Sequence, residues 1–449
     1  MSLLDINNDA PMRPYINTGT LFDLATGDYR LGMKNDYILD GGLSTCLGIT
    51  GRPQTYKSGI AGSLIARALT IHPEAEAFVY DTEGSVARGE DRYNDFVQKP
   101  VSDRINFFNT TNMSGTDFYQ AFKDICDNKQ KLRKDYLVES PFINLKTRKP
   151  YKVFIPTFVL VDSFSMMTGD ATGDAYTKND IDSTGLNTLF LKDGMFKTRI
   201  MRDLPIRASK IGVYVILTAH IGDKIDLDPY SPTPKQMQYM KGNDRVKNVG
   251  SGFNFLTTGM LQTTKAEVMT DSNKSCLYPN KHSNNTDVNL VTTMAVRAKN
   301  NGAGNLVPYV FSQVQGLLSG VTDFQFLRDH KNYGLTAKGN NQQFSPYLYP
   351  DANLTRNNLR DTLAENYRIN RALELTAQLC FIQNVWSTFR LPEVVNTPID
   401  KFAELLTHNE KGMVDRILES TGVWSTSKQE RERLTIIDTL HLLTSEIKK

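Results

Sequence analysis

The feature that most constrains the fold is an alternation of short, β-branched apolar runs with helix-compatible segments, between about residues 36 and 320. Runs of this kind are typical of parallel strands buried on both faces, because the connecting helices cover the sheet. The predicted strands are 45–50, 77–81, 105–109, 157–162, 213–218, 260–263 and 292–296. The predicted helices are 58–69, 116–131 and 186–206, which repeat apolar residues every three or four positions. We therefore predict an α/β fold with a mostly parallel central sheet.

The segments on either side of this alternation differ in character. Residues 1–36 are turn-rich and predict an N-terminal arm or cap, while 37–320 form the predicted core. A polar stretch, 321–350, predicts a linker, and 351–449 predict a small helical C-terminal domain with helices at 354–386, 399–406 and 430–447. Inside the core, segments 165–185 and 221–250 lack periodicity. Loops of that length are uncommon in a compact domain, and they are usually functional or disordered.

Charge and composition exclude several classes of protein. The 52 basic and 49 acidic residues leave a net charge of +3, so any nucleic-acid site must be a local patch rather than a uniformly basic surface. No stretch approaches the roughly 18 apolar residues that span a bilayer, and the first residues lack the charged and apolar regions of a signal peptide. The four cysteines are scattered without a CxxC pair. We expect a reduced, soluble, cytoplasmic protein.

A phosphate-binding loop is predicted where GRPQTYKS joins the first core strand to the following helix. Backbone N–H groups and the positive helix end would cradle phosphate, Lys57 would reach the β and γ oxygens of ATP, and the Ser58 hydroxyl would ligate Mg²⁺. Tyr56 stands where the general pattern has glycine. The alternative is a surface turn with a solvated lysine. The predicted nucleotide-binding residues of the loop are Gly51, Arg52, Pro53, Gln54, Thr55, Tyr56, Lys57, Ser58 and Gly59.

Acidic residues end two of the other predicted strands. FVYDTE ends in Asp81 and Glu83, and TFVLVDS ends in Asp162 and Ser163. Ligands of open parallel sheets lie beyond the carboxyl ends of the strands, so these acids should converge on Lys57. Asp162 would hold Mg²⁺ through water, and Glu83 would orient and deprotonate the attacking water. The alternative is that the acids only solvate the strand ends.

The order GRPQTYKS, YDTE, VLVDS and ILTAH resembles the RecA-type recombinases, in particular their phage members, over about residues 36–318. That family also places a bulky aromatic residue before the phosphate-loop lysine. The resemblance implies a RecA-like P-loop ATPase core, with Glu83 as the catalytic glutamate and Asp162 as the Walker B acid. It also implies that His220 senses the γ-phosphate and that Tyr93 or Arg92 covers the adenine. A purely structural role for His220 is the alternative.

The same resemblance places two DNA-binding loops at the aperiodic segments. The second segment combines cations that neutralise phosphate with side chains that stack on bases, and it ends in the glycine-rich NVGSGFNFL. The first segment is acidic, so direct phosphate contact from it is not expected. An ordinary solvated basic loop is the alternative for the second. The predicted DNA-binding residues are Lys224, Lys235, Tyr239, Lys241, Arg245 and Lys247.

Arg297 and Lys299 lie two apart on a predicted strand, so both side chains face the same way. Two like charges on one face of a buried sheet are costly unless an anion meets them. The resemblance implies that this pair reaches into the ATP site of a neighbouring subunit as part of the catalytic set. Such a head-to-tail interface builds rings or open helical filaments. The alternative is an edge strand with two solvated cations.

These expectations describe an ATP- and Mg²⁺-dependent DNA recombinase that forms filaments on single-stranded DNA and promotes homologous pairing and strand exchange. Its expected partners are single-stranded DNA, homologous duplex DNA, further copies of the chain, and loader or single-strand-binding proteins, with no membrane. A hexameric RecA-fold helicase or motor would carry nearly the same core motifs, because a fold does not fix a function. A nucleotide-gated assembly protein whose long loops bind another protein is a further alternative.

Overall fold

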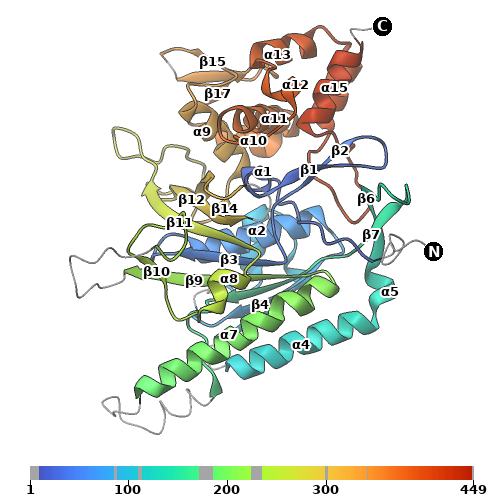
Figure 1. Cartoon of the computed structure of the whole chain (residues 1–449). Coiled ribbons are helices and arrows are strands. Elements are labelled where there is room, and N and C mark those ends of the chain that lie inside the picture. Colours follow the sequence, from blue (N-terminus) through green and yellow to red (C-terminus); the bar gives the residue numbers. More distant parts are fainter. Residues whose placement is uncertain are drawn as a thin grey trace.

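A computed structural model describes residues 10–84, 88–109, 114–170, 186–223, 235–298, 302–340 and 342–446. Its centre is a ten-stranded sheet in the order β14-β13-β12-β11-β3-β9-β8-β4-β5, with β10 paired to β9 (Figure 1). The strands from β11 to β5 run parallel. They are β11 (Gly259–Val268), β3 (Cys46–Gly51), β9 (Val213–Asp223), β8 (Thr157–Asp162), β4 (Glu76–Asp81) and β5 (Ile105–Asn109). The predicted α/β fold with a mostly parallel central sheet is confirmed.

Antiparallel strands extend this sheet. They are β12 (Val288–Ala298), β13 (Leu306–Ser312), β14 (Gly316–Leu317) and β10 (Asp244–Val246). Strands β5 and β8 have the predicted bounds, whereas β9 runs five residues beyond the predicted end at 218. Ala219 and His220 still pair with β3 in the parallel sheet, and the last three residues of β9, Ile221–Asp223, pair with β10 instead.

Helices cover both faces of the sheet, as the apolar strands require (Figure 1). One face carries α2 (Lys57–Ile71) and α3 (Asp91–Val97), and the other carries α4 (Gly115–Lys131), α7 (Leu186–Lys210) and α8 (Gly252–Leu256). Helix α4 buries Phe118, Phe122 and Cys126, which are spaced by one turn, and Ser114 caps its start by accepting from the N–H of Asp117 at 3.1 Å. No helix among the described residues is long and apolar enough to cross a lipid bilayer.

Small elements surround the core. The N-terminal part forms α1 (Leu21–Thr26) and a hairpin of β1 (Asp28–Leu31) and β2 (Tyr37–Asp40), so the predicted boundary between arm and core at 36 falls inside that hairpin. A second hairpin joins β6 (Leu137–Ile143) to β7 (Pro150–Phe154). A 3-10 turn (Ser102–Arg104) and α5 (Arg133–Tyr136) complete the connections.

The segment predicted as a linker, 321–350, is folded. It contains most of α9 (Ser319–Asp329) and the strands β15 (Leu335–Lys338) and β16 (Gln343–Pro346), because Phe324 and Leu327 face the core. One hydrophobic cluster continues from the central sheet through α9 into α11, so the C-terminal helices pack on the core directly. The remaining elements are β17 (Leu354–Thr355), α10 (Leu359–Glu365), α11 (Tyr367–Asn384), α12 (Pro392–Val395), α13 (Ile399–Thr407), α14 (Lys411–Glu419) and α15 (Ile436–Glu446).

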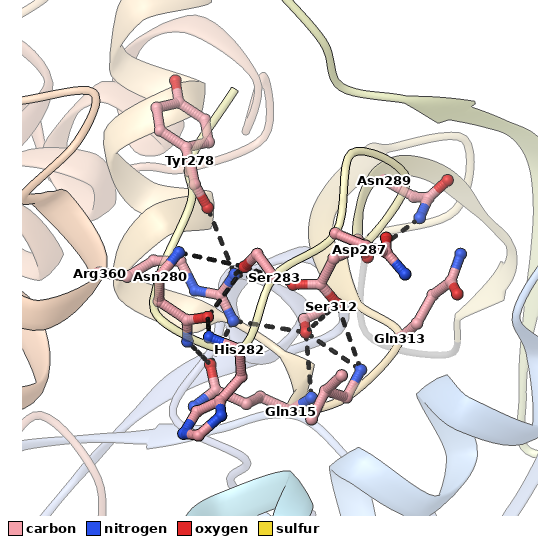
Figure 2. Close-up of polar contacts among 12 residues, drawn as sticks. Tyr278, Asn280, His282, Ser283, Asp287, Asn289, Ser312, Gln313, Gln315 and Arg360 are labelled. Atoms are coloured by element: carbon pink, nitrogen blue, oxygen red, sulfur yellow. Dashed lines mark hydrogen bonds and ion pairs between the residues drawn. The ribbon is translucent and has the colours of Figure 1, made fainter. Parts of the chain in front are cut away.

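A buried ion pair attaches the C-terminal helices to the sheet. Arg360 of α10 donates to Asp287 Oδ2 at 2.8 Å, and the two side chains are 4% and 2% exposed. Figure 2 shows the surrounding hydrogen bonds, in which Ser283 Oγ accepts from Arg360 and Ser312 Oγ donates to Asp287, both at 2.8 Å. Gln315 also accepts from Arg360. The charges are therefore paired and hydrogen-bonded, as buried charges must be.

Replacing Arg360 with methionine should lower the free energy of unfolding by about 3–5 kcal/mol, because it leaves the buried carboxylate of Asp287 without its counter-charge. Urea-induced unfolding measures the effect. The matched control is Arg368→Met, since Arg368 pairs with Asp415 and Glu419 at a more exposed position and should change stability by at most about 1 kcal/mol. Equal urea midpoints for the two variants would contradict the role given to Arg360.

Candidate functional site

Four predicted site residues meet at the carboxyl edge of neighbouring parallel strands. Gly51 at the end of β3 lies beside His220 of β9, and Asp81 at the end of β4 lies beside Asp162 at the end of β8. These strands are adjacent in the order β3-β9-β8-β4. The carboxyl edge is where open α/β sheets bind ligands. The structure therefore brings together residues that are far apart in the sequence, such as Gly51 and His220.

The loop between β3 and α2 is tightly packed and includes residues in the left-handed conformation. A Cβ on Gly51 would lie 1.8 Å from Thr263 Oγ1, so only glycine fits there. Gln54 and Tyr56 both have positive φ, 59° and 60°. Helix α2 then begins at Lys57, with no acidic residue in its first turn and no side-chain cap from the part of the chain that is described. The backbone N–H groups of its first turn therefore remain available to an anion.

Tyr56 adopts the left-handed conformation that glycine adopts without steric cost. Its ring lies 4.8 Å from the ring of Phe311, and its hydroxyl accepts from Gln313 Nε2 at 3.3 Å. A Cβ on Gly59 would come within 2.4 Å of Phe311 Cζ, so Gly59 makes the room for that ring. Ring packing thus stabilises a backbone strained by about 1–2 kcal/mol, which accounts for tyrosine at the position of the usual glycine.

Lys57 points back into the loop. Its side chain donates to the carbonyl of Arg52 at 3.0 Å, and the residue is 7% exposed. Burial lowers the pKa of Lys57, while the carboxylates of Glu83 and Asp162 oppose that shift. The ammonium group is therefore held beside two carboxylates at low exposure, where an arriving phosphate would gain more from it than in water.

Ser58 and Asp162 supply oxygen atoms beside that ammonium group. Thr218 Oγ1 donates to Asp162 Oδ1. Burial raises the pKa of the Asp162 carboxyl, hydrogen bonds from Thr218 and Ser58 oppose the shift, and the nearby Glu83 and Asp81 add to it. A hydroxyl and a carboxylate oxygen fit Mg²⁺, which takes few protein ligands and keeps waters or phosphate oxygens for the rest. Among the described residues no group of three or more His, Cys, Asp or Glu side chains could hold a metal ion by itself.

Glu83 contacts His220 directly. His220 Nε2 and Glu83 Oε1 are 2.7 Å apart, and both side chains are partly exposed. The backbone N–H of His220 donates to Ser165 Oγ at 2.9 Å, and its carbonyl accepts from the N–H of Lys247 at 2.8 Å. His220 thus lies between a candidate general base and the segments that follow β8 and β10.

Arg52 connects the loop between β3 and α2 to Asp223 and Asp244 of the segment 221–250, which we call the basic segment. Its guanidinium donates to Asp223 at 2.6 and 3.0 Å and to Asp244 at 3.0 Å. Asp223 and Asp244 face each other across the β9–β10 pair, and Asp244 also accepts from Gln262 Nε2 at 2.7 Å. Sequence analysis missed both acids, since no spacing rule relates them to a loop some 170 residues earlier.

Residues 221–223 and 235–250 of the basic segment are described, and Lys224 lies outside the described residues. Lys235 and Lys241 are exposed, Tyr239 is 39% exposed, and Arg245 donates to backbone carbonyls within its own turn. Lys247 donates to the carbonyl of Asp223 at 2.9 Å and is also exposed. Cations and an aromatic ring therefore share one short surface segment.

Tyr93 and Arg92 differ in their surroundings. Tyr93 is only 2% exposed, and its ring packs against Phe96 inside the core. The prediction that Tyr93 covers an adenine requires an accessible ring, and the structure does not provide one. Arg92 lies nearer the surface and donates to the carbonyls of Gln313 and Val314.

Arg297 lies away from the loop between β3 and α2. It pairs with Met260 of β11, which in turn pairs with Gly48 of β3, three residues before Gly51. Arg297 therefore lies two strands away from β3 and about 10 Å toward the amino ends of the parallel strands. Its guanidinium donates to the carbonyl of Asn254 in α8. Lys299 lies outside the described residues.

Comparisons with protein-family models and with curated proteins find no match to this chain. The site is therefore characterised by its own geometry. Five residues converge at the carboxyl edge of the sheet, next to the basic segment: Lys57, Ser58, Asp162, Glu83 and His220.

Proposed function

We propose that the chain is a DNA-dependent ATPase that polymerises on single-stranded DNA and promotes homologous pairing and strand exchange, as its resemblance to RecA-type recombinases implies. The observation that carries the proposal is the meeting of Lys57, Asp162 and Glu83 at the carboxyl edge of the strands. A cation, a metal-binding oxygen and a candidate base are the groups that hydrolysis of a phosphoanhydride requires.

Each residue would have a distinct task in that reaction. The loop N–H groups and Lys57 would bind the phosphates, while Ser58 and Asp162 would hold Mg²⁺, which neutralises charge on the phosphate oxygens. Glu83 would orient and deprotonate the attacking water, and His220 would fix the orientation of Glu83 through their 2.7 Å contact.

The proposed dependence of ATP hydrolysis on DNA rests on two contacts between the carboxyl edge of the sheet and the basic segment. Arg52 of the phosphate loop bridges Asp223 and Asp244, and the carbonyl of His220 accepts from the N–H of Lys247. Cations along this segment would neutralise the phosphates of single-stranded DNA, and Tyr239 would stack on a base. A change at one site would then be transmitted to the other.

Glu83→Gln should slow ATP hydrolysis about 10²–10⁴-fold while ATP binding is retained, because glutamine cannot accept the proton of the attacking water. Phosphate release and the affinity for a fluorescent ATP analogue measure the two effects separately. Glu90→Gln, at an exposed acid nearby in the sequence, is the matched control. A loss of nucleotide binding in the Glu83→Gln variant would instead indicate a structural or metal-binding role.

Neutralising Lys241, Arg245 and Lys247 together should weaken binding to single-stranded DNA and flatten its salt dependence. Removing one cation that meets a phosphate should reduce the slope of log K against log salt concentration by about 0.7, so the slope of the triple variant should fall by up to about 2. Fluorescence anisotropy over a salt series measures the slope. The control neutralises the exposed lysines Lys99, Lys131 and Lys210. Equal slopes for the two triple variants would place the DNA elsewhere.

A further inference from the structure

Helix α7 carries a lysine that is almost completely buried. Lys197 is 1% exposed, and its ammonium donates to the carbonyl of Asn248 at 2.6 Å and to that of Ser165 at 3.3 Å. Asp193, one turn earlier on the helix, lies 3.0 Å away and supplies the counter-charge. Burial lowers the pKa of Lys197, and Asp193 opposes the shift. An ammonium group this deeply buried is stable only with such a set of partners.

The two carbonyls belong to different segments beyond the carboxyl edge of the sheet. Ser165 follows β8, whereas Asn248 ends the basic segment after β10. A hydrogen bond and a close backbone approach add to the arrangement. Asp193 Oδ1 accepts from the N–H of Gly169 at 3.1 Å, and a Cβ on Gly250 would lie 2.7 Å from the carbonyl of Gly194. One turn of α7 therefore fixes the start of one segment and the end of the other.

These segments also hold His220. The N–H of His220 donates to Ser165 Oγ, and its carbonyl accepts from the N–H of Lys247, the residue before Asn248. Because His220 contacts Glu83, an unbroken set of contacts runs from the candidate base through His220 to the two segments and ends at Lys197. Neither segment can shift relative to the other without breaking a hydrogen bond of the buried ammonium.

We propose that Lys197 is the positioning residue that makes these two segments respond together to the nucleotide site, and so couples nucleotide binding to binding of single-stranded DNA. This inference rests on the proposed function. The coupling is the ratio of DNA affinities with and without nucleotide, and it must equal the effect of DNA on nucleotide affinity. Typical coupling ratios are about 5–150-fold.

The test replaces Lys197 with methionine, which keeps the length of the stem and removes the three donors. The dissociation constant of a fluorescent single-stranded oligonucleotide is measured with and without a slowly hydrolysed ATP analogue. We expect the ratio of the two constants to fall from about tenfold or more to below about twofold. DNA-free ATP hydrolysis should stay within about twofold of the original rate, because Lys197 touches none of Lys57, Asp162 or Glu83. The matched control, Lys210→Met, removes an exposed lysine at the end of the same helix.

Three results would overturn the inference: a Lys197→Met variant with an undiminished ratio, an equal fall in the ratio for Lys210→Met, or an unmodified chain that binds DNA equally with and without nucleotide. If Lys197→Met does not fold, Ser165→Ala takes its place in the same measurement. It removes only the oxygen that accepts from His220, and an undiminished ratio in that variant overturns the inference. A failure of the proposed function looks different, since the unmodified chain would then bind no single-stranded DNA under any condition.

Discussion

Replacing Lys57 with alanine should reduce ATP hydrolysis by about 10²–10³-fold or more, because the ammonium stabilises charge that develops on the phosphoryl group in the transition state. The fold should survive. Lys57 is buried beside Asp162 and Glu83, and among the described residues its ammonium donates to the carbonyl of Arg52. Its removal also relieves the desolvation of a cation. Steady-state phosphate release measures the rate, and circular dichroism during thermal unfolding measures the stability.

Lys57→Arg is the informative companion variant, since it keeps the charge and changes its geometry. We expect it to stay strongly impaired because a planar guanidinium does not replace a compact ammonium in the space below the loop. If Lys57→Ala hydrolyses ATP at nearly the original rate, then the loop from Gly51 to Ser58 is only a surface turn.

Replacing Arg297 with alanine should lower ATP hydrolysis by about 10³–10⁵-fold while each chain still binds ATP. The resemblance to RecA-type recombinases implies that Arg297 acts across an interface with a neighbouring copy. Its place two strands from Gly51, toward the amino ends of the parallel strands, agrees with that expectation. A cation supplied in this way meets charge that develops only in the transition state. Nucleotide affinity and phosphate release, measured on the same preparation, separate binding from catalysis.

Mixing the two inactive variants tests whether the site is shared. A junction between a Lys57→Ala chain and an Arg297→Ala chain can pair an intact phosphate loop with an intact arginine, which neither variant achieves alone. We therefore expect part of the activity to return in mixtures. If the mixtures assemble but remain as inactive as the two parent variants, Arg297 does not act across an interface. Its hydrogen bond to Asn254 in α8 would then indicate a structural role within its own chain.

The central part of the fold is predictable because its signals are local. Buried parallel strands have continuous apolar runs, and helices α2, α4 and α7 begin within a residue of the predicted positions. The sequence of 321–350 predicts a linker because a polar stretch begins at residue 330. Buried side chains before and within that stretch, such as Phe324, Leu327 and Phe344, nevertheless attach the segment to the core. Short hairpins such as β1–β2 carry too few residues to establish a period.

The candidate site also has a part that the sequence predicts and a part that it does not. Asp81, Asp162 and His220 could be brought together from sequence because the carboxyl ends of parallel strands share an edge. The bridge from Arg52 to Asp223 and the burial of Tyr93 depend on which loop lies beside which strand, and no local pattern encodes that.

The most direct test of the account is electron microscopy of the purified chain with long single-stranded DNA and a slowly hydrolysed ATP analogue. Omitting the analogue, and separately using the Lys57→Ala variant, controls for nonspecific coating of the DNA. We expect continuous helical filaments that require both DNA and nucleotide. Closed rings under the same conditions would favour a hexameric motor, and single dispersed molecules would contradict assembly on DNA altogether.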